Sequence, residues 1–165
     1  MPFVEDARLN TIGISAGSAF SAPLFISTVR GTIAPSNNTF FEFGMDLGLV
    51  SNYDNAGYYS IFPYAHYNFF LPFAPSGNQS RGGWYIGFGG GYMRSKYSFN
   101  ENSNEYIFLS DDSLIFQYFS GNIVTGFNIA DVIDISYTFR SNFAIATSKL
   151  SVGYTKRFRT GSSEQ

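Results

Sequence analysis

Apolar and polar side chains alternate along much of the chain. Within residues 39–51 the odd positions from 41 to 49 are apolar, whereas the even positions from 42 to 48 carry glycines and the acidic residues Glu42 and Asp46. Successive side chains of a β-strand point to opposite faces of its sheet, so this period of two predicts a strand with one apolar and one hydrophilic face. Residues 133–142 alternate as clearly. Residues 58–73 and 150–158 alternate too, although Pro63 lacks a ladder donor and Lys156 interrupts the apolar face.

Four further segments alternate less regularly, which brings the number of predicted strands to eight. These four segments are 9–20, 23–33, 84–99 and 114–129. Residues typical of turns separate the segments, for example at 35–38 and 52–57. Short connections make neighbouring strands antiparallel. We therefore predict an all-β, up-and-down barrel of eight antiparallel strands, with both chain ends on one side.

The direction of the two faces decides whether such a barrel is soluble or lies in a membrane. The chain has no run of about eighteen uninterrupted apolar residues, which excludes a transmembrane helix and leaves strands as the only way to cross a membrane. The polar face consists mainly of Gly, Ser, Thr and Asn, whereas soluble sheets usually carry far more Lys and Glu. Small side chains suit the narrow lumen of an eight-stranded barrel. We therefore expect a transmembrane β-barrel with its apolar face toward lipid and without a wide pore.

The charges of the polar face would then lie in the lumen, where each needs a partner of opposite sign. We expect an interior ionic network of Arg30, Glu42, Asp46, Asp134, Arg140, Lys149 and Arg157. Within it, Glu42 and Asp46 are expected to pair with Arg140, Lys149 or Arg157. On the outer face, aromatic residues are expected to form girdles at the two membrane boundaries. One girdle would contain Phe69, Trp84, Tyr154 and Phe158, and the other Tyr59, Tyr92 and Phe139.

Composition supports a strand-rich membrane protein, because aromatic residues make up 19% of the chain and charged residues only 13%. A formal net charge of -2 gives no basic patch for nucleic acid, which we do not expect as a partner. The absence of cysteine excludes disulfides and thiolate metal sites. The glycine-rich residues 87–91 lack the features of a phosphate loop, and the acidic residues of 100–113 lack the spacing of calcium ligands. We expect neither a cofactor nor a metal.

Two consecutive predicted strands resemble a strand pair of small bacterial outer-membrane barrels of the OmpA, OmpX and OmpW type. They are residues 64–72 (YAHYNFFLP) and 84–92 (WYIGFGGGY). The last predicted strand is similar to the C-terminal signal through which such barrels are recognised by the barrel-assembly machinery of the outer membrane. The residues that carry this similarity are Leu150, Val152, Tyr154 and Phe158.

The resemblance implies a location in the bacterial outer membrane, with outer-membrane lipids as partners and both termini in the periplasm. The corresponding division of the chain is an N-terminal tail 1–8, a barrel 9–158 and a C-terminal tail 159–165. The longest outward loop, 100–113, is where we expect an extracellular ligand to bind. Because residues 1–6 lack the features of a secretory signal, we expect a mature form with an added Met.

Members of this class act as anchors, adhesins, conduits or lipid-modifying enzymes, and we expect a non-enzymatic protein whose surface loops serve anchoring or surface interaction. A conduit for small hydrophobic molecules, like the OmpW type, is an alternative because Phe40, Phe62 and Phe70 lie on the polar face. A lipid-modifying enzyme would depend on His66, the only histidine. Some lipid A deacylases of this fold carry Ser two residues after a His, where this chain has Asn68. A soluble lipocalin-like barrel, with its apolar face turned inward around a ligand, is the remaining alternative.

Overall fold

The computed structural model describes residues 9–19, 23–53, 56–73, 82–99 and 113–158. The predicted tails 1–8 and 159–165 lie outside the described residues, as does the predicted 100–113 loop except for its last residue.

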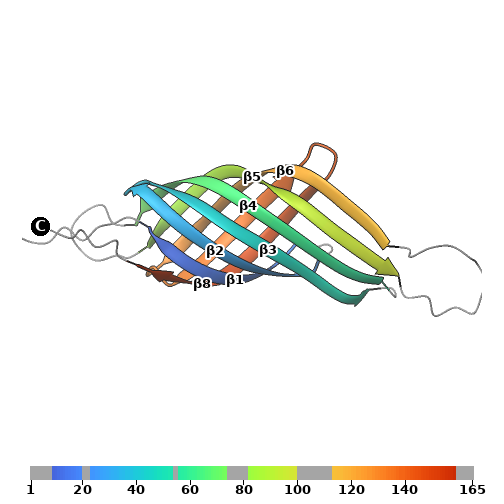
Figure 1. Ribbon diagram of the computed structural model, residues 1–165. Helices are drawn as coiled ribbons and strands as arrows, with labels where there is room; N and C mark the ends of the chain where they lie inside the picture. Colours follow the sequence, from blue (N-terminus) through green and yellow to red (C-terminus); the bar gives the residue numbers. More distant parts are fainter. Residues whose placement is uncertain (1–8, 20–22, 54–55, 74–81, 100–112, 159–165) are drawn as a thin grey trace, which may run out of the picture.

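Eight antiparallel strands form a closed barrel, in which each strand pairs with its neighbours in the sequence and β8 pairs with β1 (Figure 1). The strands are β1 (Thr11–Ser18), β2 (Phe25–Ser36), β3 (Thr39–Tyr53), β4 (Ala56–Pro72), β5 (Gly82–Phe99), β6 (Ser113–Ile129), β7 (Ile133–Ser141) and β8 (Ala146–Arg157). The prediction of an all-β barrel with eight antiparallel strands is confirmed. No helix in the described part of the chain is long and apolar enough to span a membrane.

The first and last strands meet at one end of the barrel, because Thr11 at the start of β1 pairs with Arg157 at the end of β8. We call this end the terminal end. Strands β2, β4, β6 and β8 end there, whereas β1, β3, β5 and β7 end at the opposite end, which we call the far end.

Two predicted turns are shorter in the structure than the sequence indicated. The 35–38 turn consists only of Asn37 and Asn38, because β2 continues to Ser36. Pairing of β2 with β3 shifts register between Ile33 and Ser36, and this irregularity accommodates Pro35, which has no N–H to donate to the ladder. The strands flanking the predicted 52–57 turn are likewise longer, since backbone pairing continues after the side-chain alternation has ended.

The apolar side chains of the alternating pattern face outward and the polar side chains face the interior. The outward residues Phe88 and Leu71 are 59% and 69% exposed, whereas the inward residues Glu42 and Asn68 are 3% and 0% exposed. Soluble proteins have the opposite distribution, with large apolar side chains inside and carboxylates outside. This arrangement does not fit the soluble lipocalin-like alternative.

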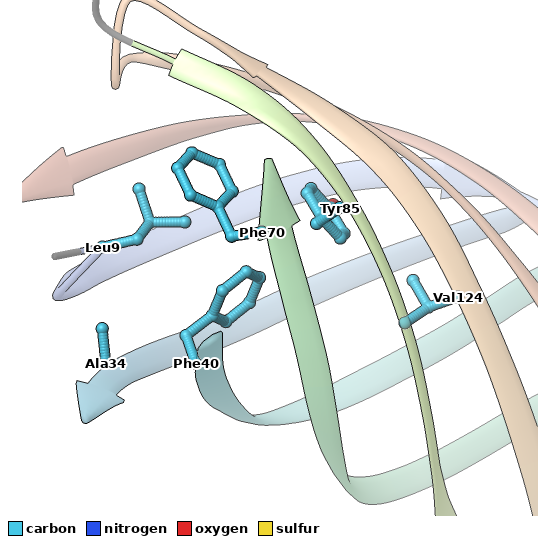
Figure 2. Packing of buried hydrophobic residues seen from close by; sticks show 6 residues of the cluster. All are labelled: Leu9, Ala34, Phe40, Phe70, Tyr85 and Val124. Atoms are coloured by element: carbon cyan, nitrogen blue, oxygen red, sulfur yellow. The ribbon is translucent and has the colours of Figure 1, made fainter. Parts of the chain in front are cut away.

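An apolar cluster fills the interior near the terminal end, and we call it the terminal plug (Figure 2). Its members are Leu9, Ala34, Phe40, Phe70, Tyr85 and Val124. The ring of Phe40 packs edge-on against those of Phe70 and Tyr85, at centroid distances of 6.2 and 5.5 Å. Such edge-to-face contacts are favourable between aromatic rings. The lumen is therefore filled by side chains at this end.

At the far end the barrel wall is taller on one side. The four strands from β3 to β6 contain 15 to 18 residues each, whereas β7 contains nine and β1 eight. The pairing of β6 with β7 ends at Gly121 and Ser141, so residues 113–120 of β6 extend beyond β7 while most of them stay paired with β5. The far end is consequently lowest along β7, β8 and β1.

Small residues on the inner face leave space for larger neighbouring side chains. A substitution of Gly89 on β5 tests whether this space is needed. A Cβ atom there would clash with the carbonyl oxygen of Ala65 and lie 2.7 Å from Cδ2 of His66. We predict that Gly89→Ala lowers the free energy of unfolding by about 1–3 kcal/mol, as overpacking does elsewhere. Equilibrium urea unfolding in detergent micelles measures this change.

The matched control is Gly31→Ala on β2, because the nearest atom to a Cβ there is the carbonyl oxygen of Thr11 at 3.7 Å. Equal stability of the two variants would contradict the tight packing at Gly89.

Candidate functional site in the polar interior

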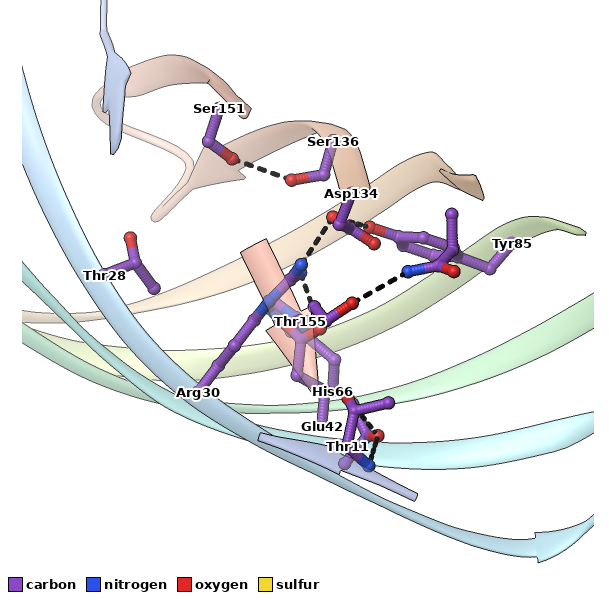
Figure 3. Close-up of polar contacts among 12 residues, drawn as sticks. Thr11, Thr28, Arg30, Glu42, His66, Tyr85, Asp134, Ser136, Ser151 and Thr155 are labelled. Carbon is purple, nitrogen blue, oxygen red and sulfur yellow. Dashed lines mark hydrogen bonds and ion pairs between the residues drawn. The ribbon is translucent and has the colours of Figure 1, made fainter. Parts of the chain in front are cut away.

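Charged and polar side chains from six strands meet in the middle of the barrel around Arg30, and we call them the Arg30 cluster (Figure 3). Arg30 Nη1 lies 3.2 Å from Glu42 Oε2, and Arg30 Nη2 lies 2.6 Å from Asp134 Oδ1. The hydroxyl of Tyr85 donates to the same oxygen of Asp134 over 2.9 Å. His66 Nδ1 lies 3.4 Å from Glu42 Oε1. The other ring nitrogen of this histidine, Nε2, is 3.0 Å from the amide nitrogen of Asn122.

A second group, the Asp46 cluster, lies closer to the far end. Lys149 Nζ donates to both carboxylate oxygens of Asp46 over 2.9 and 3.0 Å, and Arg140 forms an ion pair with the same carboxylate. The hydroxyl of Thr28 donates to Asp46 as well. The guanidinium carbon of Arg140 also lies 4.3 Å from the centre of the Phe62 ring, within the range of a cation–π contact.

The two clusters carry opposite net formal charges. With His66 neutral, one arginine and two carboxylates leave the Arg30 cluster with one negative charge. Two cations and one carboxylate leave the Asp46 cluster with one positive charge. All these ionic side chains are at least nine-tenths buried, and buried ions are tolerated when they are paired and hydrogen-bonded. The interior as a whole is thus electrically balanced across β2, β3, β7 and β8.

Six of the seven residues predicted for the interior ionic network lie in these clusters, and Arg157 does not. Arg157 Nη1 pairs with Asp131 Oδ2 over 2.6 Å in the turn between β6 and β7, where its side chain is 23% exposed. The prediction that Glu42 pairs with Arg140, Lys149 or Arg157 was wrong, because its ion-pair partner is Arg30. The alternation specifies which face a residue occupies but not which strand it meets across the lumen.

Four of the buried inward residues that the sequence analysis does not assign to the network are Thr28, Tyr64, Tyr85 and Asn122. The ring centre of Tyr64 lies 5.7 Å from Lys149 Nζ. The inward positions of these four residues in the alternating pattern were the sequence signal that could have assigned them to the interior. The two tyrosines were overlooked because aromatic residues were expected at the outer girdles.

The residues predicted for the two girdles lie on the outer surface. Phe69, Trp84, Tyr154 and Phe158 are 50–56% exposed at the terminal end, and Tyr59 and Phe139 are 41% exposed toward the far end. Tyr92 is half-buried, with its ring 5.0 Å from that of Phe119 and its hydroxyl bonded to Gln117. The residues of the predicted assembly signal, Leu150, Val152, Tyr154 and Phe158, are all exposed at the outer surface, the first three along β8 and Phe158 just beyond it.

A cavity of about 200 Å³ lies on the far-end side of the Asp46 cluster. Asp46, Arg140 and Lys149 form its floor, and its walls include Phe62, Met93, Tyr58, Tyr97 and Tyr118. On the terminal-end side of this floor lie the Arg30 cluster and then the terminal plug. The geometry is that of a blind pocket with a charged floor and a wall that combines aromatic, aliphatic and hydroxyl-bearing side chains.

The closed barrel has the fold of the small eight-stranded outer-membrane barrels, the class that the sequence resemblance implies. Neither a protein-family model nor a curated protein matches the chain in sequence. Solved structures of such barrels match it over most of its length. Neisserial surface protein A (NspA) is 14% identical with a TM-score of 0.60, covering 90% of this chain and 94% of that one.

Ail, the attachment invasion locus protein of Yersinia pestis, is 12% identical with a TM-score of 0.53, covering 88% of this chain and 94% of that one. The outer-membrane enzyme PagL is 12% identical with a TM-score of 0.50, covering 90% of this chain and 99% of that one. At these identities the likeness establishes the fold alone. An attachment protein and an enzyme share it, so the fold does not decide the activity.

Asp46 forms ion pairs with two buried cations, so its removal tests the electrostatic balance of the interior. We predict that Asp46→Asn lowers the free energy of unfolding by about 3–5 kcal/mol, because Arg140 and Lys149 would remain buried without an ionic partner. Asp131→Asn is the matched control, and for its partly exposed pair with Arg157 a loss of at most about 1 kcal/mol is expected. Urea unfolding in micelles measures both values, and similar losses in the two variants would argue against the balance.

Proposed function

We propose that the protein is an integral, non-enzymatic protein of the bacterial outer membrane, in which the barrel anchors the far-end loops at the cell surface. The observation that carries this proposal is the outer surface of the barrel, which exposes large apolar side chains on every strand. Monomeric soluble proteins rarely expose contiguous apolar patches beyond a few hundred Å². A surface of this kind is stable when acyl chains cover it.

The height of the apolar surface supports a membrane location. Outward side chains of β5 are uncharged from Trp84 to Tyr92 and become basic at Arg94 and Lys96. At about 3.4 Å per residue and a tilt of about 40°, the uncharged stretch is about 20 Å tall, close to the band of about 25 Å in outer-membrane barrels. Among the described residues, the only other outward charge on a strand is Lys156, at the terminal end. Basic side chains at both boundaries suit the phosphates of lipid headgroups.

The surroundings of His66 speak against a lipid-modifying enzyme. His66 is 4% exposed and faces the interior, beside Glu42 and Asn122. Asn68, in place of a Ser two residues later, is fully buried. A membrane lipid lies outside the barrel wall, so neither side chain is placed to reach its ester bonds.

The filled interior speaks against a conduit through the barrel. Phe40 and Phe70 belong to the terminal plug, and Phe62 packs beneath Arg140. Phe40 and Phe70 therefore fill the lumen, and Phe62 lines a cavity that ends at the charged floor, so none of the three lines a path through the barrel. A closed and filled barrel can anchor the loops without an open path through its lumen, so anchoring is the function that we propose.

The orientation that we propose places the terminal end in the periplasm and the far end outside the cell. The two turns of the terminal end that are described, 37–38 and 130–132, are as short as periplasmic turns of such barrels usually are. The extracellular ligand expected at 100–113 remains part of this proposal. The barrel-assembly machinery and outer-membrane lipids are its other proposed partners.

Single-cysteine variants test the location and the orientation together, because the chain contains no cysteine of its own. Ala144 lies in the exposed far-end turn and Val132 in the exposed terminal-end turn. With the protein expressed behind a secretion signal, we predict that a membrane-impermeant maleimide labels Ala144→Cys on intact cells. Labelling of Val132→Cys is expected only after the outer membrane is permeabilised.

The unsubstituted chain is the control for background labelling. If only Val132→Cys is labelled on intact cells, the barrel has the opposite orientation to the one that we propose. Protection of both sites on intact cells, with both labelled in the soluble fraction, would refute the membrane location.

A further inference from the structure

We propose that the far-end cavity binds a small aromatic anion, with the anionic group on Arg140 and Lys149 and the ring among the aromatic side chains of the wall. This binding activity goes beyond anchoring and does not depend on what the loops contact. Three properties of the cavity support it, namely its size, the charge of its floor and the chemistry of its wall.

The size of the cavity suits a molecule with a single ring. A cavity of 150 Å³ lined by apolar side chains is known to bind benzene in another protein. The volume of about 200 Å³ in this barrel leaves room for a ring and one small substituent. A long acyl chain would exceed this volume.

The charge of the floor selects an anion. Arg140 and Lys149 are 6% and 4% exposed and share one carboxylate, that of Asp46, which leaves one positive charge without a counterion in the cluster. Arg140 Nε is buried and has no hydrogen-bond partner among the described residues. A carboxylate accepts well from a guanidinium and an ammonium group. One bound anion would neutralise the floor and provide this acceptor.

The wall selects a ring over an aliphatic chain. Phe62 and Met93 are buried beside the floor, with Tyr118 packed against them. Aromatic side chains bind a further ring in edge-on or offset geometry, and a methionine sulfur makes favourable contacts with ring edges. The Phe62 ring already lies beneath the Arg140 guanidinium, so a ligand ring can lie next to it while the anionic group stays at the cation.

The position of the cavity makes it a pocket for ligands from the far side. Ile145 and Thr147 line it beside the low part of the wall, where β7 and β8 meet, and Phe116 lines it on the tall side. The Arg30 cluster and the terminal plug lie behind the floor, so a ligand would leave by the route it entered.

Titration of benzoate and of benzyl alcohol, its uncharged analogue of similar size, tests the proposal on the whole protein in zwitterionic detergent. Calorimetry and chemical-shift changes of the pocket residues report binding. We expect saturable binding of benzoate, weaker by roughly tenfold or more for benzyl alcohol, because a hydrogen bond to a charged group contributes about 1.5–3 kcal/mol. Lack of saturable benzoate binding, or equal binding of both compounds, would overturn the proposal.

Two variants and a control locate the site. Lys149→Met removes the excess positive charge and is expected to lower benzoate affinity by roughly tenfold while leaving that of benzyl alcohol unchanged. Met93→Trp keeps every charge but fills the cavity, so both compounds should fail to bind. Lys156→Met, at the outer surface of the terminal end, should bind like the unsubstituted protein. Benzoate binding that survives Met93→Trp would place the anion elsewhere and refute the pocket, whether or not the Lys149 variant folds.

Discussion

Closure of the hydrogen-bonded ladder between β1 and β8 is the constraint on which the rest of the structure depends. Once the ladder is closed, no strand edge remains along the paired stretches, and every side chain must point either into a narrow lumen or away from the barrel. The outward set is apolar and the inward set polar, so the surroundings must be apolar for the fold to be stable. Closure thus links a local alternation of side chains to the membrane environment that we propose for the whole molecule.

The same closure creates the electrostatic problem that the two ionic clusters solve. Charged side chains that would be solvated on an open sheet are held in a lumen with little water, where each must be neutralised by a residue on another strand. Arg30 joins carboxylates of β3 and β7, and Asp46 joins cations of β7 and β8. These pairs tie together strands that are distant in sequence. The terminal plug completes the filling. The Asp46 cluster taken alone has one more cation than carboxylates, and for this reason we propose the cavity beside it as the place where a ligand binds.

The sequence predicted the class of fold and the face of nearly every strand residue, because both depend on a local period of two. It did not predict the partner of a given charge. Glu42 meets Arg30 and not a cation of β7 or β8, because cross-lumen contacts depend on the tilt and stagger of all eight strands, which no single segment encodes. Arg157 has the inward alternation of its strand but lies at its end, where a turn residue, Asp131, is closer than the network. The cavity was not predictable either, since its lining side chains come from strands that are distant in sequence.

The outward orientation of the apolar face is tested most directly by the fluorescence of Trp84, the only tryptophan of the chain. Trp84 is 54% exposed on the outer surface, with its ring 5.4 Å from that of Phe127. In protein refolded into lipid vesicles, phospholipids brominated on their acyl chains are predicted to quench this emission strongly, while acrylamide in the aqueous phase quenches it weakly. Strong quenching by acrylamide together with no effect of the brominated lipids would contradict a lipid-facing outer surface.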